Sequence, residues 1–366
     1  MKNLYLCGYP EIIKMTFTGK LIEWYNRNKR DLPWRRTKDP YMIWLSEIIL
    51  QQTRIEQGLP YYLRFIASYP TIKELATADE QNILKLWQGL GYYSRARNLH
   101  TAAKEITSRM NSTFPQTYEK ILKLKGVGEY TAAAIASISY GLPYPVVDGN
   151  VLRFFSRYFG VREPINSTAA KKQIYLFAKQ LIGSGDPGTF NQAVMEFGAL
   201  CCKPANPGCT HCIFKKQCFA FINGLTECIP VRPKPIVRRE RYFHYFLIRI
   251  NGRKSIYLKK REAEDIWKNL FDFPMIETSK DLLWKDLIRK KEWEEIFNNS
   301  IITRLGVSKQ FKHILTHQLV IARFYEIEIP KPLTSFFILT KLRDLEKYPY
   351  PRLIERYLTS LPSPRN

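Results

Sequence analysis

The stretch LKLKGVGEYTA, residues 122–132, joins two helix-like segments through a turn that contains Gly126 and Gly128. Glycines at both ends of this turn let the backbone bend and come close to a ligand. The turn also exposes amide N–H groups at the start of a helix, where a phosphate binds well. Plain connections between two helices have the same pattern, so the turn alone does not identify a binding site.

The chain is strongly basic. Its 366 residues include 57 Lys and Arg against 33 Asp and Glu, a formal net charge of +24. An excess this large attracts polyanions, which makes nucleic acid the leading class of partner and the glycine turn a candidate clamp on its backbone. A well-solvated surface is the alternative, because charge alone identifies neither a nucleic acid nor an activity. The hydrophobic content of 45% excludes a disordered protein.

A group of cysteines follows the pattern C-x6-C-x2-C-x5-C. They are Cys202, Cys209, Cys212 and Cys218. Thiolates spaced this closely are soft ligands that can enclose one metal centre from a single loop. Structural zinc usually takes two C-x-x-C pairs with a longer stretch between them, and disulfides suit small secreted scaffolds. The spacing therefore favours a [4Fe–4S] cluster, with zinc second and disulfides last.

The chain changes in character near residue 229. Before it, apolar residues recur at three- and four-residue intervals, which predicts helices. Residues 229–241, IPVRPKPIVRRER, have no periodicity and read as an extended linker. Beyond the linker, residues 242–250 and 255–260 read as a β-hairpin around the turn NGRK, and 319–329 as a further strand.

We therefore expect an N-terminal extension at 1–15, an all-α domain at 16–228 and a smaller α+β domain at 242–366. No apolar stretch approaches the roughly 18 residues that span a bilayer, and the N-terminus does not resemble a signal peptide. A reducing, cytoplasmic location is expected, close to the nucleoid if the source is bacterial.

Two carboxyl groups have settings that suit chemistry. Asp148 precedes a helical run, where it can cap the helix and stay ionised. Glu47 shares a predicted helix face with Ile43, Trp44 and Leu50. This setting requires either a cationic partner or a raised pKa. One carboxyl would then be protonated and the other ionised, as in glycoside-cleaving sites. A plain helix cap is the simpler interpretation of Asp148.

The chain resembles a known family over nearly its whole length. Residues 20–228 resemble the helix-hairpin-helix DNA glycosylases that carry an iron–sulfur loop, specifically the adenine DNA glycosylases of the MutY type. The matching stretches are KRDLPWR (29–35), WLSEIILQQTR (44–54), WQGLGYYSRARNLH (87–100), GVGEYTAAAIAS (126–137), VVDGNV (146–151), FNQAVMEFGA (190–199) and the four-cysteine loop. KNLFDFP (268–274) and FKHILTHQ (311–318) resemble the family's MutT-like (Nudix-fold) domain.

The resemblance implies a fold: an all-α helix-hairpin-helix glycosylase domain with a [4Fe–4S] loop, followed by a smaller α+β MutT-like domain. Within the first domain it implies a six-helix barrel at about 38–146 and a cluster subdomain made of 16–37 and 147–228. It also implies a monomer that removes adenine mispaired with 8-oxoguanine, or with guanine, from double-stranded DNA.

The same resemblance implies residue roles. Glu47 would protonate adenine N7, and Asp148 would stabilise the oxocarbenium-like sugar and trap it before water attacks. Tyr130 and Asn150 would hold the carboxylates and the sugar. The implied DNA contacts are Arg35 and Gln192 on the base, Leu50, Gln51, Gln52 and Tyr92 in the gap and on the opposite strand, Gly126 and Gly128 on the backbone, and Thr316 and His317 on 8-oxoguanine.

Two other functions stay open at this point. Glycosylases of the endonuclease III type carry a lysine directly after G-V-G-x, which attacks the sugar as a Schiff-base nucleophile. This chain has Tyr130 there, and a phenol cannot form an imine. A non-enzymatic DNA-binding protein would gain nothing from two acids near a phosphate backbone.

The second domain is not expected to be a Nudix pyrophosphatase. Such an enzyme needs a glutamate-rich helix after a glycine, and KKEWEEIF (290–297) has the wrong spacing.

Overall fold

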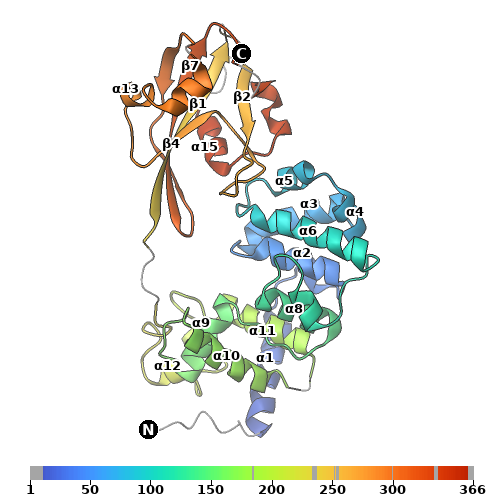
Figure 1. Ribbon diagram of the computed structural model, residues 1–366. Coiled ribbons are helices and arrows are strands. Elements are labelled where there is room, and N and C mark those ends of the chain that lie inside the picture. The colour runs from blue at the N-terminus through green and yellow to red at the C-terminus, as the bar shows by residue number, and fades with distance from the viewer. Residues whose placement is uncertain are drawn as a thin grey trace. The chain divides into compact units, whose positions relative to one another are not determined.

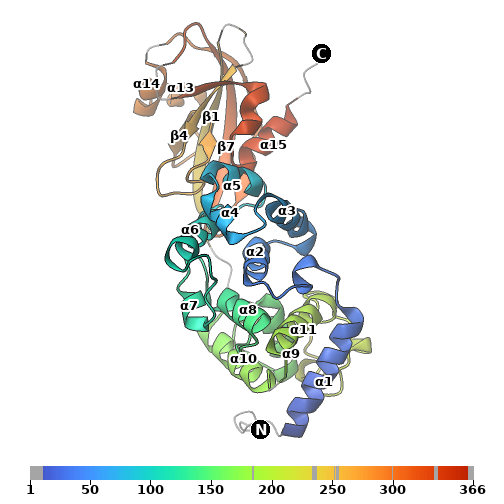
Figure 2. The same ribbon diagram turned by 90° about the vertical axis from the view of Figure 1, so that its right-hand side faces the viewer.

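The computed structural model describes residues 11–183, 185–232, 237–250, 252, 255–298, 300–333 and 337–361. The chain divides into two compact units. Met1–Thr77 and Thr101–Lys234 form the first, which we call the helical unit, and Ala78–His100 and Pro235–Asn366 form the second, the mixed unit. Their elements are labelled in Figures 1 and 2. No helix in the described ranges has the length and apolar character needed to cross a membrane.

The helical unit is built from helices throughout its described part. They are α1 (Glu11–Asn28), α2 (Pro40–Leu50), α3 (Ile55–Ser68), α4 (Ile72–Thr77), α7 (Tyr118–Leu122), α8 (Glu129–Tyr140), α9 (Gly149–Phe159), α10 (Thr168–Leu181), α11 (Pro187–Leu200) and α12 (Phe219–Ile222), with the 3-10 turns η1 (Pro33–Arg35) and η2 (Cys209–His211). Helix α6 (Ser94–Arg109) begins in the mixed unit and ends in the helical one. Helix α1 begins at Glu11, inside the segment expected to be an extension, of which residues 1–10 lie outside the described chain.

Helix α8 is the centre of the helical unit. Its residues from Thr131 to Ile138 are all buried, and it packs against α2 and α11 (Figure 2). Two glycines of α11 make the close packing possible. A Cβ on Gly188 would lie 2.9 Å from the Ile138 Cα of α8, and one on Gly198 would lie 2.7 Å from the Asn150 carbonyl oxygen of α9. The end of α8 and the start of α9 are therefore held against one helix.

The mixed unit contains two sheets. The larger has the order β4 (Met275–Thr278), β1 (Arg239–Ile250), β7 (Gln318–Ile329), β5 (Thr303–Val307), and β6 (Phe311–Ile314) also pairs with β7. The smaller has the order β3 (Phe271–Asp272), β2 (Ser255–Lys260), β8 (Ile338–Lys341). Strands β1 and β7 are parallel, and the other pairs are antiparallel. The helical segments are α5 (Glu80–Trp87), α13 (Trp284–Leu287), α14 (Lys291–Phe297), η3 (Leu342–Lys347) and α15 (Arg352–Ser360).

The strand expected at 319–329 is confirmed by β7, but the predicted hairpin is wrong in its pairing. Both of its strands form, yet β1 pairs with β4 and β7 while β2 pairs with β3 and β8 in the other sheet. The physical reason lies in β1, whose residues 243–248 are all buried, as in a central strand covered on both faces. Of the predicted turn, Asn251, Arg253 and Lys254 lie outside the described residues. Strand β1 also starts at Arg239, inside the expected linker.

Candidate active site and cysteine loop

Glu47 lies near the end of α2 and is buried, with 8% of its surface exposed. This burial raises the pKa of Glu47 to about 7, although its hydrogen bond with Tyr130 acts in the opposite direction. Nearby Asp148 raises that pKa further, and Arg35 lowers it. A carboxyl with this pKa is partly protonated at neutral pH and can give up its proton to a base.

Asp148 caps α9, as its position in the sequence predicted. Its Oδ1 accepts the backbone N–H groups of Asn150 and Val151 at 2.9 and 2.7 Å, and its Oδ2 accepts the Asn150 side-chain amide at 2.7 Å. Burial raises the pKa of Asp148, while these three hydrogen bonds and the charge of Arg153 oppose the rise. Three donors around one carboxyl group favour its ionised form, which is an acceptor only.

Tyr130 lies at the start of α8, next to both carboxyl groups. Burial raises its pKa well above the ordinary tyrosine value, so it remains a phenol. Its hydroxyl is hydrogen-bonded with Glu47 and contacts Met195 Sδ at 3.4 Å. Because a phenol has one hydrogen, it can serve one of these acceptors at a time. The structure thus brings Glu47, Tyr130, Asp148 and Asn150 into one site.

Arg153, which the sequence analysis missed, connects this site with the cysteine loop. Its guanidinium donates to Asn150 Oδ1 at 2.9 Å, to the Gly198 carbonyl at 2.7 Å and to the Cys202 carbonyl at 2.7 Å. Asn150 in turn holds Asp148. The signal that could have revealed Arg153 is its spacing, since it lies one helical turn after Gly149 and Asn150 in α9.

Arg35 and Gln192 each form hydrogen bonds with a different side chain of the helical unit. Arg35 donates to both Glu196 oxygens, at 2.8 and 2.7 Å. Burial opposes ionisation of Glu196, yet hydrogen bonds from Arg35 and Arg30 lower its pKa to about 2. The Gln192 Oε1 accepts the Tyr25 hydroxyl at 2.8 Å. Glu196 was also missed, although it follows Gln192 by four residues and so lies on the same side of α11.

The predicted backbone clamp and gap residues lie at helix ends of the helical unit. Gly126 has φ +81°, and an added Cβ on Gly128, the N-cap of α8, would meet no atom within 4 Å. Gln51 is the C-cap of α2 and donates to Thr131 Oγ1 at 3.2 Å. Gln52 is exposed with φ 57°, and Leu50 is the last residue of α2.

The remaining predicted contacts belong to the mixed unit. Tyr92 is 45% exposed with φ 48°, and its hydroxyl lies 3.2 Å from Thr316 Oγ1. Thr316 and His317 are exposed in the turn between β6 and β7. The structure thus brings Tyr92 and Thr316 together.

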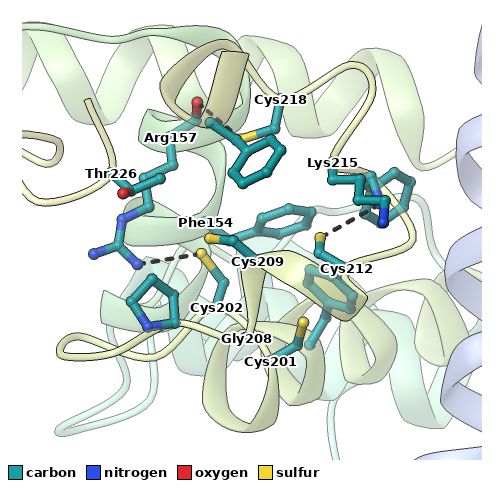
Figure 3. Close-up of a pocket in the computed structure, with 14 residues that line it drawn as sticks. Phe154, Arg157, Cys201, Cys202, Gly208, Cys209, Cys212, Lys215, Cys218 and Thr226 are labelled. Carbon is teal, nitrogen blue, oxygen red and sulfur yellow. Dashed lines mark hydrogen bonds between the residues drawn. The ribbon is translucent and has the colours of Figure 1, made fainter. Parts of the chain in front are cut away.

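The cysteine loop surrounds the pocket shown in Figure 3. All four predicted cysteines line it together with Cys201 and the aromatic residues Phe154, Phe197, Phe214 and Phe221. Cys202 Sγ accepts Arg157 Nη1 at 3.5 Å, and Cys212 Sγ accepts the Phe214 N–H at 3.4 Å. The six cysteines of the described residues are free thiols. Within those residues, no three His, Cys, Asp or Glu side chains are arranged to hold one metal ion.

Known proteins have sequences similar to this chain. Residues 45–179 match the HhH-GPD superfamily of base excision DNA repair proteins, and residues 244–360 match the NUDIX domain. The adenine DNA glycosylase of Buchnera aphidicola subsp. Baizongia pistaciae is 36% identical over 307 residues, which are 83% of this chain and 83% of that protein. The human adenine DNA glycosylase is 41% identical over 222 residues, 58% of this chain and 41% of the human protein.

A solved structure of a thermostable thymine-DNA glycosylase is also similar, with a TM-score of 0.54 and 29% identity over 58% of this chain and 98% of that one. It supports the fold of the helical part. Both domains occur in the expected order, and the similarity to the Buchnera enzyme extends over most of both chains. This chain therefore belongs to the MutY-type adenine DNA glycosylases, which act in base excision repair and combine a helix-hairpin-helix domain with a C-terminal Nudix domain.

Proposed function

We propose that this glycosylase acts as a monomer on adenine opposite 8-oxoguanine, or opposite guanine, in double-stranded DNA, and that it is monofunctional. The observation that carries the proposal is the pair of carboxyl groups near Tyr130: burial raises the pKa of Glu47 to about 7, whereas three hydrogen bonds oppose the rise at Asp148. The adenine must leave the base stack to reach them, because its reactive atoms are otherwise covered.

Glu47 is the general acid of the proposed reaction. It gives its proton to adenine N7, which makes the base a neutral leaving group when the bond from C1′ to N9 breaks. Its pKa of about 7 leaves a substantial protonated fraction at neutral pH. Tyr130 stabilises the ionised Glu47 after transfer, because its hydroxyl can then donate to the carboxylate.

Asp148 faces the positive charge that develops on the sugar. Its carboxylate stabilises the oxocarbenium-like state and then bonds to C1′. Water, deprotonated by Glu47, replaces the carboxylate, and the configuration at C1′ is retained. Asn150 and Arg153 are positioning residues, because Arg153 fixes the amide of Asn150, which fixes Asp148.

Contacts with the base and the duplex come from several elements. Gln192 contacts the extruded adenine. Arg35, which is bound to Glu196, lines the same site. The amides of the turn at Gly126 and Gly128 hold a phosphate. Leu50, Gln51, Gln52 and Tyr92 fill the gap and meet the opposite strand, and Thr316 and His317 read 8-oxoguanine.

The cysteine loop carries a [4Fe–4S] cluster held by Cys202, Cys209, Cys212 and Cys218. The chemistry of the pocket suits such a group, because thiols line it, N–H groups contact two of their sulfurs, and aromatic side chains form the walls. With such a cluster bound, the loop would be ordered, and Lys203, Lys215 and Lys216 would then be placed for contact with phosphates. Metal analysis of protein purified without oxygen should give about four irons per chain, and stoichiometric zinc would contradict the assignment.

The proposal is tested with three duplexes that contain adenine opposite 8-oxoguanine, adenine opposite guanine, or thymine glycol. Adenine should be released from the first two, and the strand should break only after alkali treatment. Cleavage of the thymine glycol duplex without alkali, or efficient borohydride trapping of the protein on DNA, would instead support a bifunctional lyase.

A further inference from the structure

The cluster pocket contains one more thiol than a four-cysteine site needs. Cys201 directly precedes Cys202, lines the same pocket as the four proposed ligands and is drawn with them in Figure 3. Its thiol is hydrogen-bonded to the thiol of Cys212. Cys201 is therefore within the proposed ligand set and not a separate surface cysteine.

Cys201 and Cys202 differ in what holds them. The sulfur of Cys202 accepts a hydrogen bond from Arg157 Nη1 at 3.5 Å, which suits the ligand of the intact cluster. Cys201 has a thiol partner, Cys212, and no ligand role in the spacing C-x6-C-x2-C-x5-C. The two neighbouring residues thus direct sulfur atoms to the same pocket from one stretch of chain.

The backbone at this point is held on both sides of the two cysteines. Cys201 is the C-cap of α11, and its N–H and that of Cys202 both contact the Phe197 carbonyl at 3.0 Å. The residues that follow, 203–206, are exposed. Arg153 holds the Cys202 carbonyl, and Arg157 holds the carbonyls of Lys203 and Pro204. The exchange of one sulfur for the other therefore rests on the side chain of Cys201, with the backbone in place.

We propose that Cys201 is a reserve ligand, which binds the cluster iron left open when Cys202 is lost. The inference rests on the iron–sulfur assignment proposed above. In the exchange, the Cys201 thiol loses its proton to solvent and its sulfur forms the bond to iron; no electron transfer is required. Tethering one residue away gives this thiol a high effective concentration at the open position. The Arg153 contact is unaffected by a side-chain change, because it uses the backbone carbonyl of Cys202.

The test compares full-length variants purified without oxygen, with iron and sulfide per chain and visible absorption as readouts. Cys201→Ala should match the wild type, and Cys202→Ala should keep at least about five-fold more iron than the double variant Cys201→Ala/Cys202→Ala. Cys209→Ala is the matched control, because the residues beside Cys209 are Gly208 and Thr210. It should lose iron as completely as the double variant.

The proposal is overturned if Cys202→Ala and the milder Cys202→Ser are both as iron-poor or insoluble as Cys209→Ala. Zinc in place of iron in the wild type would overturn the cluster assignment itself, so the two failures are distinguishable. Iron retained by the double variant would also overturn the proposal, since Cys201 would then be unnecessary.

Discussion

At the residue scale, the site depends on how differently two carboxyl groups are surrounded. Glu47 sits among apolar side chains of α2, whereas Asp148 accepts three hydrogen bonds at the start of α9. The sequence predicted both settings, because burial of Glu47 follows from helix periodicity and the cap follows from a carboxylate before a helical run. Periodicity could not predict that Tyr130 would lie beside both groups, since that depends on how α8 packs against α2.

Replacing Glu47 with glutamine should abolish adenine excision and leave binding of the mismatched duplex nearly intact. Glutamine keeps the shape of the side chain but has no acidic proton, and general acid catalysis is typically worth about 10²–10⁴-fold. Single-turnover excision and equilibrium binding, measured on the same duplex, separate the two effects. Near-normal excision by Glu47→Gln would remove the residue from the mechanism.

The same variant should change how stability depends on pH. The pKa of Glu47 is about 7 in the folded protein, above its ordinary value of 4.5. The folded state therefore binds more protons than the unfolded state between these values, and its stability falls as pH rises through that window. The loss has an upper bound of about 3 kcal/mol.

Glu47→Gln lacks this titration. Its Tm relative to the wild type should therefore rise between pH 4 and pH 8, and thermal melts at intervals across that range measure it. A constant difference in Tm would mean that the folded-state pKa is not raised.

At the element scale, α11 fixes the position of the start of α9, where Asp148 is the N-cap. Gly198 allows the two helices to approach, and its carbonyl accepts Arg153 of α9 at 2.7 Å. The same helix carries Gln192 and Glu196 on one side. Sequence reasoning identified Gln192 by resemblance but not Glu196, because a lone glutamate in an apolar helix gives no sign of the arginines that reach it from residues 30 and 35.

Gly198→Ala should lower the excision rate and destabilise the helical unit. The new Cβ would lie 2.7 Å from the Asn150 carbonyl oxygen, so α9 must move and carry Asp148 with it. Overpacking of this kind typically costs about 1–3 kcal/mol. Gly19→Ala is the control, because no atom lies within 4 Å of the Cβ it would add to α1. Equal activity of the two variants would show that α9 tolerates the shift.

At the scale of the whole molecule, the sequence predicted the two domain types in their order but not every strand partner. The strand β1 was predicted, whereas its placement in a sheet with β4 and β7 was not. A short turn between two strands favours a hairpin locally, and only the burial of both faces of β1 shows that it is a central strand. Which residues of the mixed unit meet helices α5 and α6 likewise depends on contacts between distant parts of the chain.

The double variant Thr316→Ala/His317→Ala should reduce the preference for adenine opposite 8-oxoguanine over adenine opposite guanine. Each lost contact with a base edge would cost about 1–3 kcal/mol. Thr316→Ser keeps the hydroxyl that lies near Tyr92 and should retain most of the preference. Thr303→Ala removes an exposed threonine of the same unit and serves as the control.

Measuring both duplexes at two salt concentrations separates reading of the lesion from general attraction to DNA. If the two residues only formed part of a basic clamp, their loss would weaken binding of both duplexes equally and lower its salt dependence. An unchanged preference ratio in the double variant would assign recognition of the lesion to other residues.

The contact between Tyr130 and Met195 makes the pKa of Glu47 sensitive to oxidation of the methionine sulfur. A thioether accepts hydrogen bonds weakly, but conversion to the sulfoxide places a strong oxygen acceptor near the same hydroxyl. Tyr130 would then donate to the sulfoxide and no longer to ionised Glu47, so the pKa of Glu47 would rise. Mild peroxide treatment should therefore move the pH profile of excision upward, an effect that Met195→Leu removes, and an unmoved profile would refute the link. A repair enzyme proposed to act opposite oxidised guanine would thus carry an oxidisable side chain beside its proposed proton donor.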